Sequence, residues 1–249
     1  QVRHRVVAHN TLGYGIHSPY LFNIARALLP SVEPYYAFEK IEDYRRELLR
    51  SQRVIHVDDF GTGKSGDRRV RDIARQTLKP SRESQLLMRL AVMAGAKEMV
   101  ELGTCLGVSS AYLASVGSRA HLTTFEGAPE VAAIARKGWE KLGIMNIDCI
   151  IGNLDETLAD FKPTAPLDLA FLDANHTYEA TLRYFRQLLP YAGKKSIFVL
   201  DDIHYSRGMD RAWKEISAMP EVSATMDLGV MGLVFFDKNL EKKTYYIRL

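Results

Sequence analysis

Residues 98–110 read "EMVELGTCLGVSS", a short apolar run that ends in a glycine-containing turn and leads directly into a helical pattern. Gly103 allows a tight turn after the run, and Gly107 would let a ligand approach the backbone. A helix that opens at Val108 would point its first N–H groups toward the same turn. This order of strand, turn and helix predicts the first unit of a parallel sheet covered by helices.

Four more apolar runs follow along the chain, with helical patterns between them. They occupy residues 121–126, 147–152, 167–173 and 196–202. The glycines expected to end the intervening helices are Gly117, Gly143 and Gly193. Alternating apolar runs and helical patterns predict parallel strands joined by crossover helices.

The last part of the chain changes its pattern. An apolar helical face passes through Met209, Trp213 and Ile216, and residues 222–236 then form two alternating runs that predict an antiparallel hairpin. The tail at 242–249 either adds an edge strand or packs on the core, and both readings stay open. We therefore predict an α/β fold whose seven-stranded, mostly parallel sheet carries helices on both faces and ends in a closing hairpin.

Residues 1–80 differ in kind from residues 81–249. Helical stretches at 18–30 and 41–52 are interrupted by prolines and by the glycine-rich "DDFGTGKSG" at 58–66. A triphosphate-binding loop needs glycine where Asp58 stands, so this segment is predicted to be a mobile connection. We expect a helical cap and glycine-rich connection over 1–80 and a catalytic core over 81–249.

Composition limits the class of protein. The chain has 249 residues, of which 47% are hydrophobic and 25% charged, and no apolar run approaches the ~20 residues that span a bilayer. A cytoplasmic protein without membrane contact is expected. The net charge is +3, and the basic excess lies within residues 40–89 without interleaved aromatic residues after Phe60, which favours a solvated face over a nucleic-acid surface.

The residues that end the predicted strands are polar, which matters because ligands of open α/β sheets bind beyond the carboxyl ends of the strands. Glu126 ends the second strand and is placed to accept hydrogen bonds from two ribose hydroxyls. Asn153, Leu154 and Asp155 follow the third strand and could frame a base. The spacing E-x-G-x-x-x-G from Glu101 differs from the G-x-G-x-x-G of dinucleotide folds. A purine nucleoside fits this set of residues.

Carboxylates follow the fourth and fifth strands, in "FLDANH" and "VLDDIH". Asp173, Asp201 and Asp202 would repel one another if brought together, and a hard divalent cation, Mg²⁺ above all, would offset the repulsion and hold a substrate hydroxyl as its alkoxide. The alternative is that Asp201 caps the following segment and Asp202 bonds backbone. Both readings stay open.

Over residues 80–237 the chain resembles the class I S-adenosylmethionine-dependent methyltransferases, and among them the catechol-type small-molecule O-methyltransferases. The resemblance rests on "ELGTCLGVS", on Glu126, on "GNLDE" and on the two acidic strand ends. It implies a Rossmann-like core and S-adenosylmethionine as methyl donor. The residues implied to contact this cofactor are Glu101, Gly103, Thr104, Gly107, Ser109, Glu126, Asn153, Leu154, Asp155 and Asp173.

The resemblance also implies a catalytic set. The family binds its metal with Asp, Asp and Asn, which here correspond to Asp173, Asp201 and Asp202, so Asp202 departs from the pattern. His176 stands where the family has a lysine as general base, and histidine can take up a hydroxyl proton. Asp173 and His176 are thus the expected catalytic residues. Alternatively, Asn175 caps a helix with His176 idle in its first turn. His204 is a weaker candidate.

These observations predict an enzyme that methylates a small hydroxylated acceptor, with homodimer formation left open. Methylation of nucleic acid or protein is a second reading, although "DANH" after the fourth strand lacks the N/D-P-P-Y/F tetrad usual for methylation of base amino groups. A third reading is a catalytically silent scaffold that binds S-adenosylmethionine. Such a scaffold would bind the cofactor without turnover.

Overall fold

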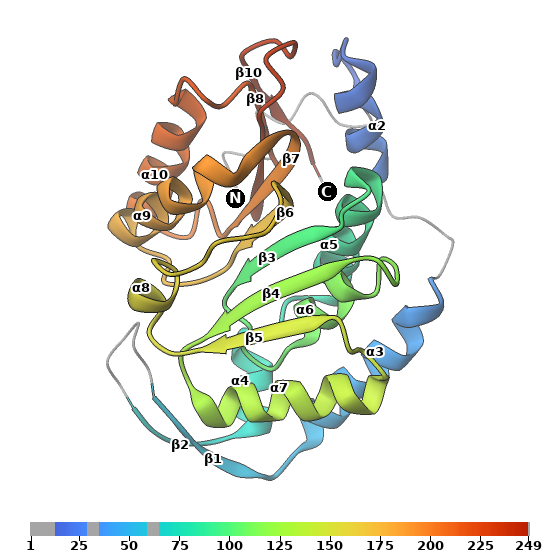
Figure 1. Ribbon diagram of the computed structural model, residues 1–249, viewed down its shortest axis with the longest axis vertical. Helices are drawn as coiled ribbons and strands as arrows, with labels where there is room; N and C mark the ends of the chain where they lie inside the picture. The colour runs from blue at the N-terminus through green and yellow to red at the C-terminus, as the bar shows by residue number, and fades with distance from the viewer. Residues whose placement is uncertain (1–12, 29–34, 59–64, 249) are drawn as a thin grey trace. The chain divides into compact units, whose positions relative to one another are not determined.

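The computed structural model describes residues 13–28, 35–58 and 65–248 (Figure 1). It divides into two compact units, which are described separately. Unit 1 comprises residues 1–31, 89–98 and 163–249, and unit 2 comprises residues 32–88 and 99–162. The predicted division of the sequence into a cap (1–80) and a core (81–249) remains a prediction.

The predicted α/β fold is confirmed. An eight-stranded sheet has the strand order β10-β8-β9-β7-β6-β3-β4-β5. The strands that match the sequence prediction are β3 (Glu98–Leu102), β4 (His121–Glu126), β5 (Ile147–Ile151), β6 (Leu167–Leu172), β7 (Ala192–Asp201), β8 (Ala224–Asp227) and β9 (Met231–Phe235). The tail, left open from sequence, adds β10 (Lys243–Tyr246), which pairs parallel with β8. The sheet therefore has one strand more than the seven predicted.

Unit 2 contains, wholly or in part, six of the described helices. They are α3 (Tyr36–Arg50), α4 (Val70–Thr77), the first part of α5 (Ser81–Ala94), α6 (Val108–Ala114), α7 (Pro129–Leu142) and α8 (Leu154–Thr157). The apolar faces of α3, α4, α6 and α7, together with Met88 of α5, form one buried cluster, in which the Tyr44 hydroxyl donates to the Leu106 carbonyl at 2.9 Å. The same tyrosine ring fills the space where a Cβ on Gly138 of α7 would lie. Because Gly138 lacks a side chain, α3 can pack closely on α7.

The glycine-rich connection joins two short strands of unit 2. Strand β1 (Val54–Val57) pairs antiparallel with β2 (Gly66–Arg69), with Val57 opposite Gly66. Residues 59–64 of "DDFGTGKSG" lie outside the described residues, and their mobility remains a prediction. A phosphate-binding loop leads from a strand into a helix, whereas this connection leads into β2.

Unit 1 contains the strands from β6 to β10, the last part of α5 and three further helices, whereas β4, β5 and nearly all of β3 belong to unit 2. Helix α2 (Pro19–Ala27) is capped by Ser18, and α9 (Tyr178–Leu188) and α10 (Arg207–Ala218) follow β6 and β7. Strand β7 pairs parallel with β6 and antiparallel with β9, which confirms the closing hairpin of β8 and β9. Among the described residues, no helix is long and apolar enough to cross a membrane.

Of the three glycines expected to end helices, one does so. Gly143 is the left-handed C-cap of α7, with φ of 72°. The other two predictions were wrong. Helix α6 ends at Ala114, before Gly117. Helix α9 ends at Leu188 because the next turn, the 3₁₀ helix η2 (Leu189–Tyr191), contains a proline without a backbone donor, and Gly193 lies in β7.

Candidate functional site

The glycine loop after β3 has the backbone that the sequence predicts. Gly103 has φ of 99° and Gly107 φ of 75°, a region that favours glycine. The structure shows a second reason for glycine at position 107, beside the predicted approach of a ligand. A Cβ there would lie 2.6 Å from the Trp139 indole nitrogen, which donates to the Gly107 carbonyl at 2.8 Å. Packing against α7 therefore requires this glycine, and its contact with cofactor remains a prediction.

Glu101, in β3, supports the glycine loop through hydrogen bonds with neighbouring side chains. Its carboxylate is fully buried and accepts hydrogen bonds from the Ser110 hydroxyl and, at 2.7 Å, from Thr124. Thr124 also pairs with the Thr104 hydroxyl at 2.7 Å, so the loop is tied to β4. A buried carboxylate needs such donors. Ser110 and Thr124 were not singled out from the sequence, because their role depends on pairing between neighbouring strands.

Glu126 ends β4 as predicted and turns its carboxylate toward the glycine loop. One oxygen accepts from the Cys105 backbone N–H at 2.7 Å, and the other accepts from Ala128 at 2.9 Å. Burial raises the pKa of this carboxyl group, and the backbone donors act in the opposite direction. The Gly127 N–H is a third backbone donor to this carboxylate. A carboxylate has about four acceptor positions, so one remains for a ligand hydroxyl while the backbone partners are kept.

The segment after β5 lies beside Glu126. Ile151 pairs with Glu126 across the two strands, and the Gly152 N–H donates to the Glu126 carbonyl at 2.9 Å. Asn153 then caps α8, its side chain accepting from the Asp155 N–H at 3.1 Å. The pairing of β4 with β5 thus places the segment that holds Asn153, Leu154 and Asp155 next to Glu126. Leu154 is half-buried on the same short helix.

In unit 1 the pairing of β6 with β7 brings two acidic strand ends together. Leu172 is paired with Leu200, so Asp173 and Asp201 both follow directly after paired residues. Asp201 is only 3% exposed. A carboxylate buried to this extent is costly unless a cation or hydrogen-bond donors compensate it.

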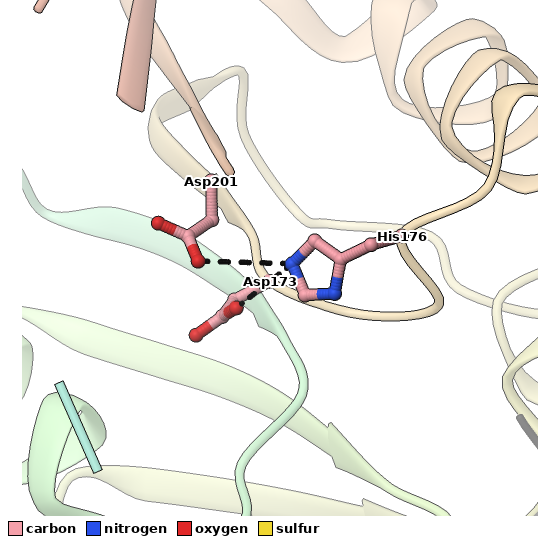
Figure 2. A group of neighbouring side chains, drawn as sticks. All are labelled: Asp173, His176 and Asp201. Carbon is pink, nitrogen blue, oxygen red and sulfur yellow. Dashed lines mark ion pairs between the residues drawn. The ribbon is translucent and has the colours of Figure 1, made fainter. Parts of the chain in front are cut away.

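His176 supplies a cationic partner for both carboxylates (Figure 2). Its Nε2 lies 3.3 Å from the nearer oxygen of Asp173 and 3.7 Å from that of Asp201. Burial alone would lower the pKa of the imidazole, but the two carboxylates outweigh this effect and raise it to about 10. The two carboxylates therefore favour the protonated ring. A protonated ring has no lone pair, so a general-base role for His176, which remains a prediction, requires the neutral ring.

The two alternative helix-cap readings of these loops were wrong. Helix α9 begins at Tyr178 with Thr177 as its N-cap, so Asn175 is not the cap and His176 precedes the helix. Ser206, not Asp201, caps α10. Thr177 and Ser206 both have extended backbone angles and a hydroxyl that accepts from the third residue of the helix, as N-caps require.

Asp202 stands at the margin of this cluster. Its side chain is 45% exposed, and its nearer oxygen is 4.0 Å from His176 Nε2. The Asp202 N–H donates to the Val230 carbonyl at 2.8 Å, which agrees with the backbone bonding considered from sequence. The role of Asp202 as a metal ligand remains a prediction.

Two further side chains belong to the loop between β7 and α10. His204, the weaker candidate, lies between Asp227 and Asp210. Its Nε2 is 2.8 Å from an Asp227 oxygen and its Nδ1 is 3.1 Å from an Asp210 oxygen, so both ring nitrogens are already paired with carboxylates. Tyr205 was missed by the sequence analysis. It is 74% exposed, and its ring centroid lies 6.2 Å from that of His176. Only the loop geometry identifies it.

The donor set suits a divalent cation. One ligand atom each from Asp173, His176 and Asp201 lie within 4.8 Å of one another. Carboxylate oxygens and a neutral imidazole nitrogen are common ligands of divalent ions. These three residues could therefore hold a metal ion, provided that the imidazole gives up its proton.

Comparisons with known proteins agree with this geometry. Residues 100–203 match a family model described as a methyltransferase domain. A catechol O-methyltransferase of Niastella koreensis is 24% identical over 170 residues, which cover 67% of this chain and 73% of that protein.

Solved structures give the same fold. The O-methyltransferase TomG of Streptomyces achromogenes, in complex with S-adenosylmethionine, superposes with a TM-score of 0.60 at 20% identity, over 82% of this chain and 91% of its own. An O-methyltransferase of Bacillus cereus with bound S-adenosylhomocysteine has a TM-score of 0.61 at 18% identity, over 82% and 92%. The predicted class, an S-adenosylmethionine-dependent methyltransferase similar to O-methyltransferases, is confirmed.

Proposed function

We propose that the chain transfers the methyl group of S-adenosylmethionine to a hydroxyl oxygen of a small acceptor, with a divalent cation assisting. The observation that carries this proposal is the pair of strand-end carboxylates, Asp173 and Asp201, which share one cationic partner. Two buried or half-buried carboxylates beside a single cation form a site that can exchange a proton for a metal ion.

The residues have separate tasks in this proposal. Glu126 binds the ribose hydroxyls, and the loop from Gly103 to Ser109 carries the methionine part of the cofactor. Asn153, Leu154 and Asp155 frame the adenine. Asp173 and Asp201 hold the cation, which lowers the pKa of the acceptor hydroxyl when bound. The sulfonium of the cofactor makes methyl transfer chemically favourable, so the protein mainly orients the two reactants.

Tyr205 favours an aromatic acceptor. Its exposed ring, tilted 53° to the imidazole of His176, offers an apolar surface beside the two carboxylates. A phenol or a vicinal aromatic diol could stack there while its hydroxyl reaches the cation. We therefore expect hydroxylated aromatic molecules to be better acceptors than aliphatic alcohols.

A chelator experiment tests the proposal. Methyl transfer from S-adenosylmethionine to a catechol should stop in chelator and return when a divalent cation is added. Asp201→Ala should abolish turnover and leave the dissociation constant for S-adenosylmethionine unchanged, whereas Asp173→Ala should weaken both. Full activity in chelator, or an active Asp201→Ala protein, would contradict the metal. Cofactor binding without turnover on any hydroxylated acceptor would favour the silent scaffold.

A further inference from the structure

The structure brings a histidine, His176, together with Asp173 and Asp201, so the third side chain of this cluster offers a nitrogen ligand. The sequence predicts Asp202 in this position, which would make an all-oxygen site suited to Mg²⁺. The cluster instead combines Asp173 and Asp201 with His176, while Asp202 lies farther out with a side chain that is 45% exposed. This exchange of donor changes which metal the site prefers.

We propose that His176 is a direct ligand of the metal and that, together with Asp173 and Asp201, it selects a divalent transition-metal ion such as Mn²⁺ over Mg²⁺. Imidazole suits transition metals, whereas Mg²⁺ prefers oxygen ligands and retains its water. The inference deepens the proposed metal-assisted function and rests on it.

The distances agree with a set of ligands that needs little movement. Ligands bound at about 2.1 Å to one ion stand roughly 3.0–3.5 Å from one another. In the structure His176 Nε2 is 3.3 Å from an Asp173 oxygen and 3.7 Å from an Asp201 oxygen. Figure 2 shows both carboxylates directed at this one ring nitrogen. Small rotations of the side chains would therefore suffice to surround an ion.

The position of His176 in the chain supports a ligand role. The residue lies in the loop before α9, and Thr177 caps the helix, so the ring is held at the strand ends and is not carried on the helix surface. Asn175 has a left-handed φ of 48°, which is uncommon for a residue other than glycine. Such strain persists where surrounding structure fixes a geometry, often at a ligand site.

Metal binding by the full chain tests the inference without any methyl acceptor. Chelator-treated protein is titrated with Mn²⁺, followed by electron paramagnetic resonance, and then with Mg²⁺ as competitor. We expect Mn²⁺ to bind at least about 10-fold more tightly than Mg²⁺. Electron spin echo spectra of bound Mn²⁺ should show coupling to one imidazole nitrogen.

Variants show whether His176 is the source of this preference. His176→Gln should weaken Mn²⁺ binding by roughly 100-fold, remove the nitrogen coupling and change Mg²⁺ binding much less. His176→Asn serves as a second variant if the first does not fold. The control is His121→Gln, which alters an exposed histidine paired with Asp148 in unit 2. This control should bind Mn²⁺ like the parent.

Two results would overturn the inference. Equal affinity for Mn²⁺ and Mg²⁺ would do so, as would bound Mn²⁺ without nitrogen coupling. If neither metal binds while calorimetry still detects S-adenosylmethionine, His176 is an internal counter-ion, and the inference fails while the methyltransferase assignment stands. Loss of cofactor binding as well would instead count against the ribose and loop assignments of the proposed function.

Discussion

Replacing Glu126 by alanine should weaken binding of S-adenosylmethionine by a predictable amount. In the structure the Glu126 carboxylate accepts the N–H groups of Cys105 at 2.7 Å and Ala128 at 2.9 Å, with Gly127 as a third backbone donor, and about one of its four acceptor positions remains. Hydrogen bonds to a charged group contribute about 1.5 to 3 kcal/mol. Loss of the ribose contacts should therefore raise the dissociation constant roughly 10- to 150-fold, since 1.4 kcal/mol is a factor of ten.

The same substitution also removes the acceptor for the Cys105 and Ala128 N–H groups, so a loss of affinity could come from a disturbed loop. A ligand lacking hydroxyls separates the two causes. 5′-Methylthioadenosine and its 2′,3′-dideoxy form are titrated by calorimetry into parent and Glu126→Ala protein. In the parent, removing the hydroxyls should cost about the same 10- to 150-fold. In Glu126→Ala, removing the hydroxyls should raise the dissociation constant by less than roughly 3-fold.

The reasoning about the ribose would be refuted by an unchanged hydroxyl penalty in the variant. A weaker affinity of the variant for both ligands, with the penalty intact, would show that Glu126 shapes the glycine loop and that another residue contacts the hydroxyls. Thermal unfolding of both proteins without ligand provides the necessary check on folding.

Three other predictions concern the acceptor side and the core. Tyr205→Ala should raise KM for a phenolic acceptor several-fold and leave an aliphatic one unaffected, measured by steady-state kinetics. The carboxylates raise the pKa of His176 in the folded protein to about 10, so without metal its contribution to the free energy of unfolding is complete below about pH 6.5 and is lost as the pH rises toward about 10. The free energies of unfolding of the parent and His176→Gln proteins, measured in urea with chelator present, should therefore become equal at high pH. Gly138→Ala, which overlaps the Tyr44 ring, should cost about 1–3 kcal/mol of unfolding free energy, while Gly117→Ala, with open space at its Cβ, should cost little.

The strands were predictable because strands covered on both faces read as continuous apolar runs. The run "LDLAFL" forms β6, in which five of the six residues are buried and only Asp168 is partly exposed. The tail was not decidable, because "KTYY" alternates weakly and its pairing with β8 depends on residues about twenty positions away. The periodicity of apolar residues indicates which positions are buried, but it does not indicate which strand pairs with which.

The site was predictable in its residue types and less so in its geometry. Carboxylates at strand ends can be read from sequence because strand ends define the ligand side of such sheets. The direction of the His176 ring cannot be read from sequence, because Asn175 and Thr177 are both good N-cap residues. The choice between them decides where α9 starts. Tyr205 and the packing reason for Gly107 depend on contacts between distant segments, which no local pattern carries.

The backbone itself marks the same loops, independently of side-chain chemistry. Among the described residues, three that are not glycine have a left-handed φ, namely Cys105 at 48°, Asn175 at 48° and Asp202 at 51°. Each lies in a loop that directly follows a strand, after β3, β6 and β7 respectively. A residue with a Cβ pays about 1–3 kcal/mol to hold such a conformation, so it persists only where neighbouring structure fixes it. Charged side chains mark two of these loops, after β6 and β7, and the left-handed backbone marks all three. Glycine would adopt this conformation without the cost, as Gly103 does in the first of them.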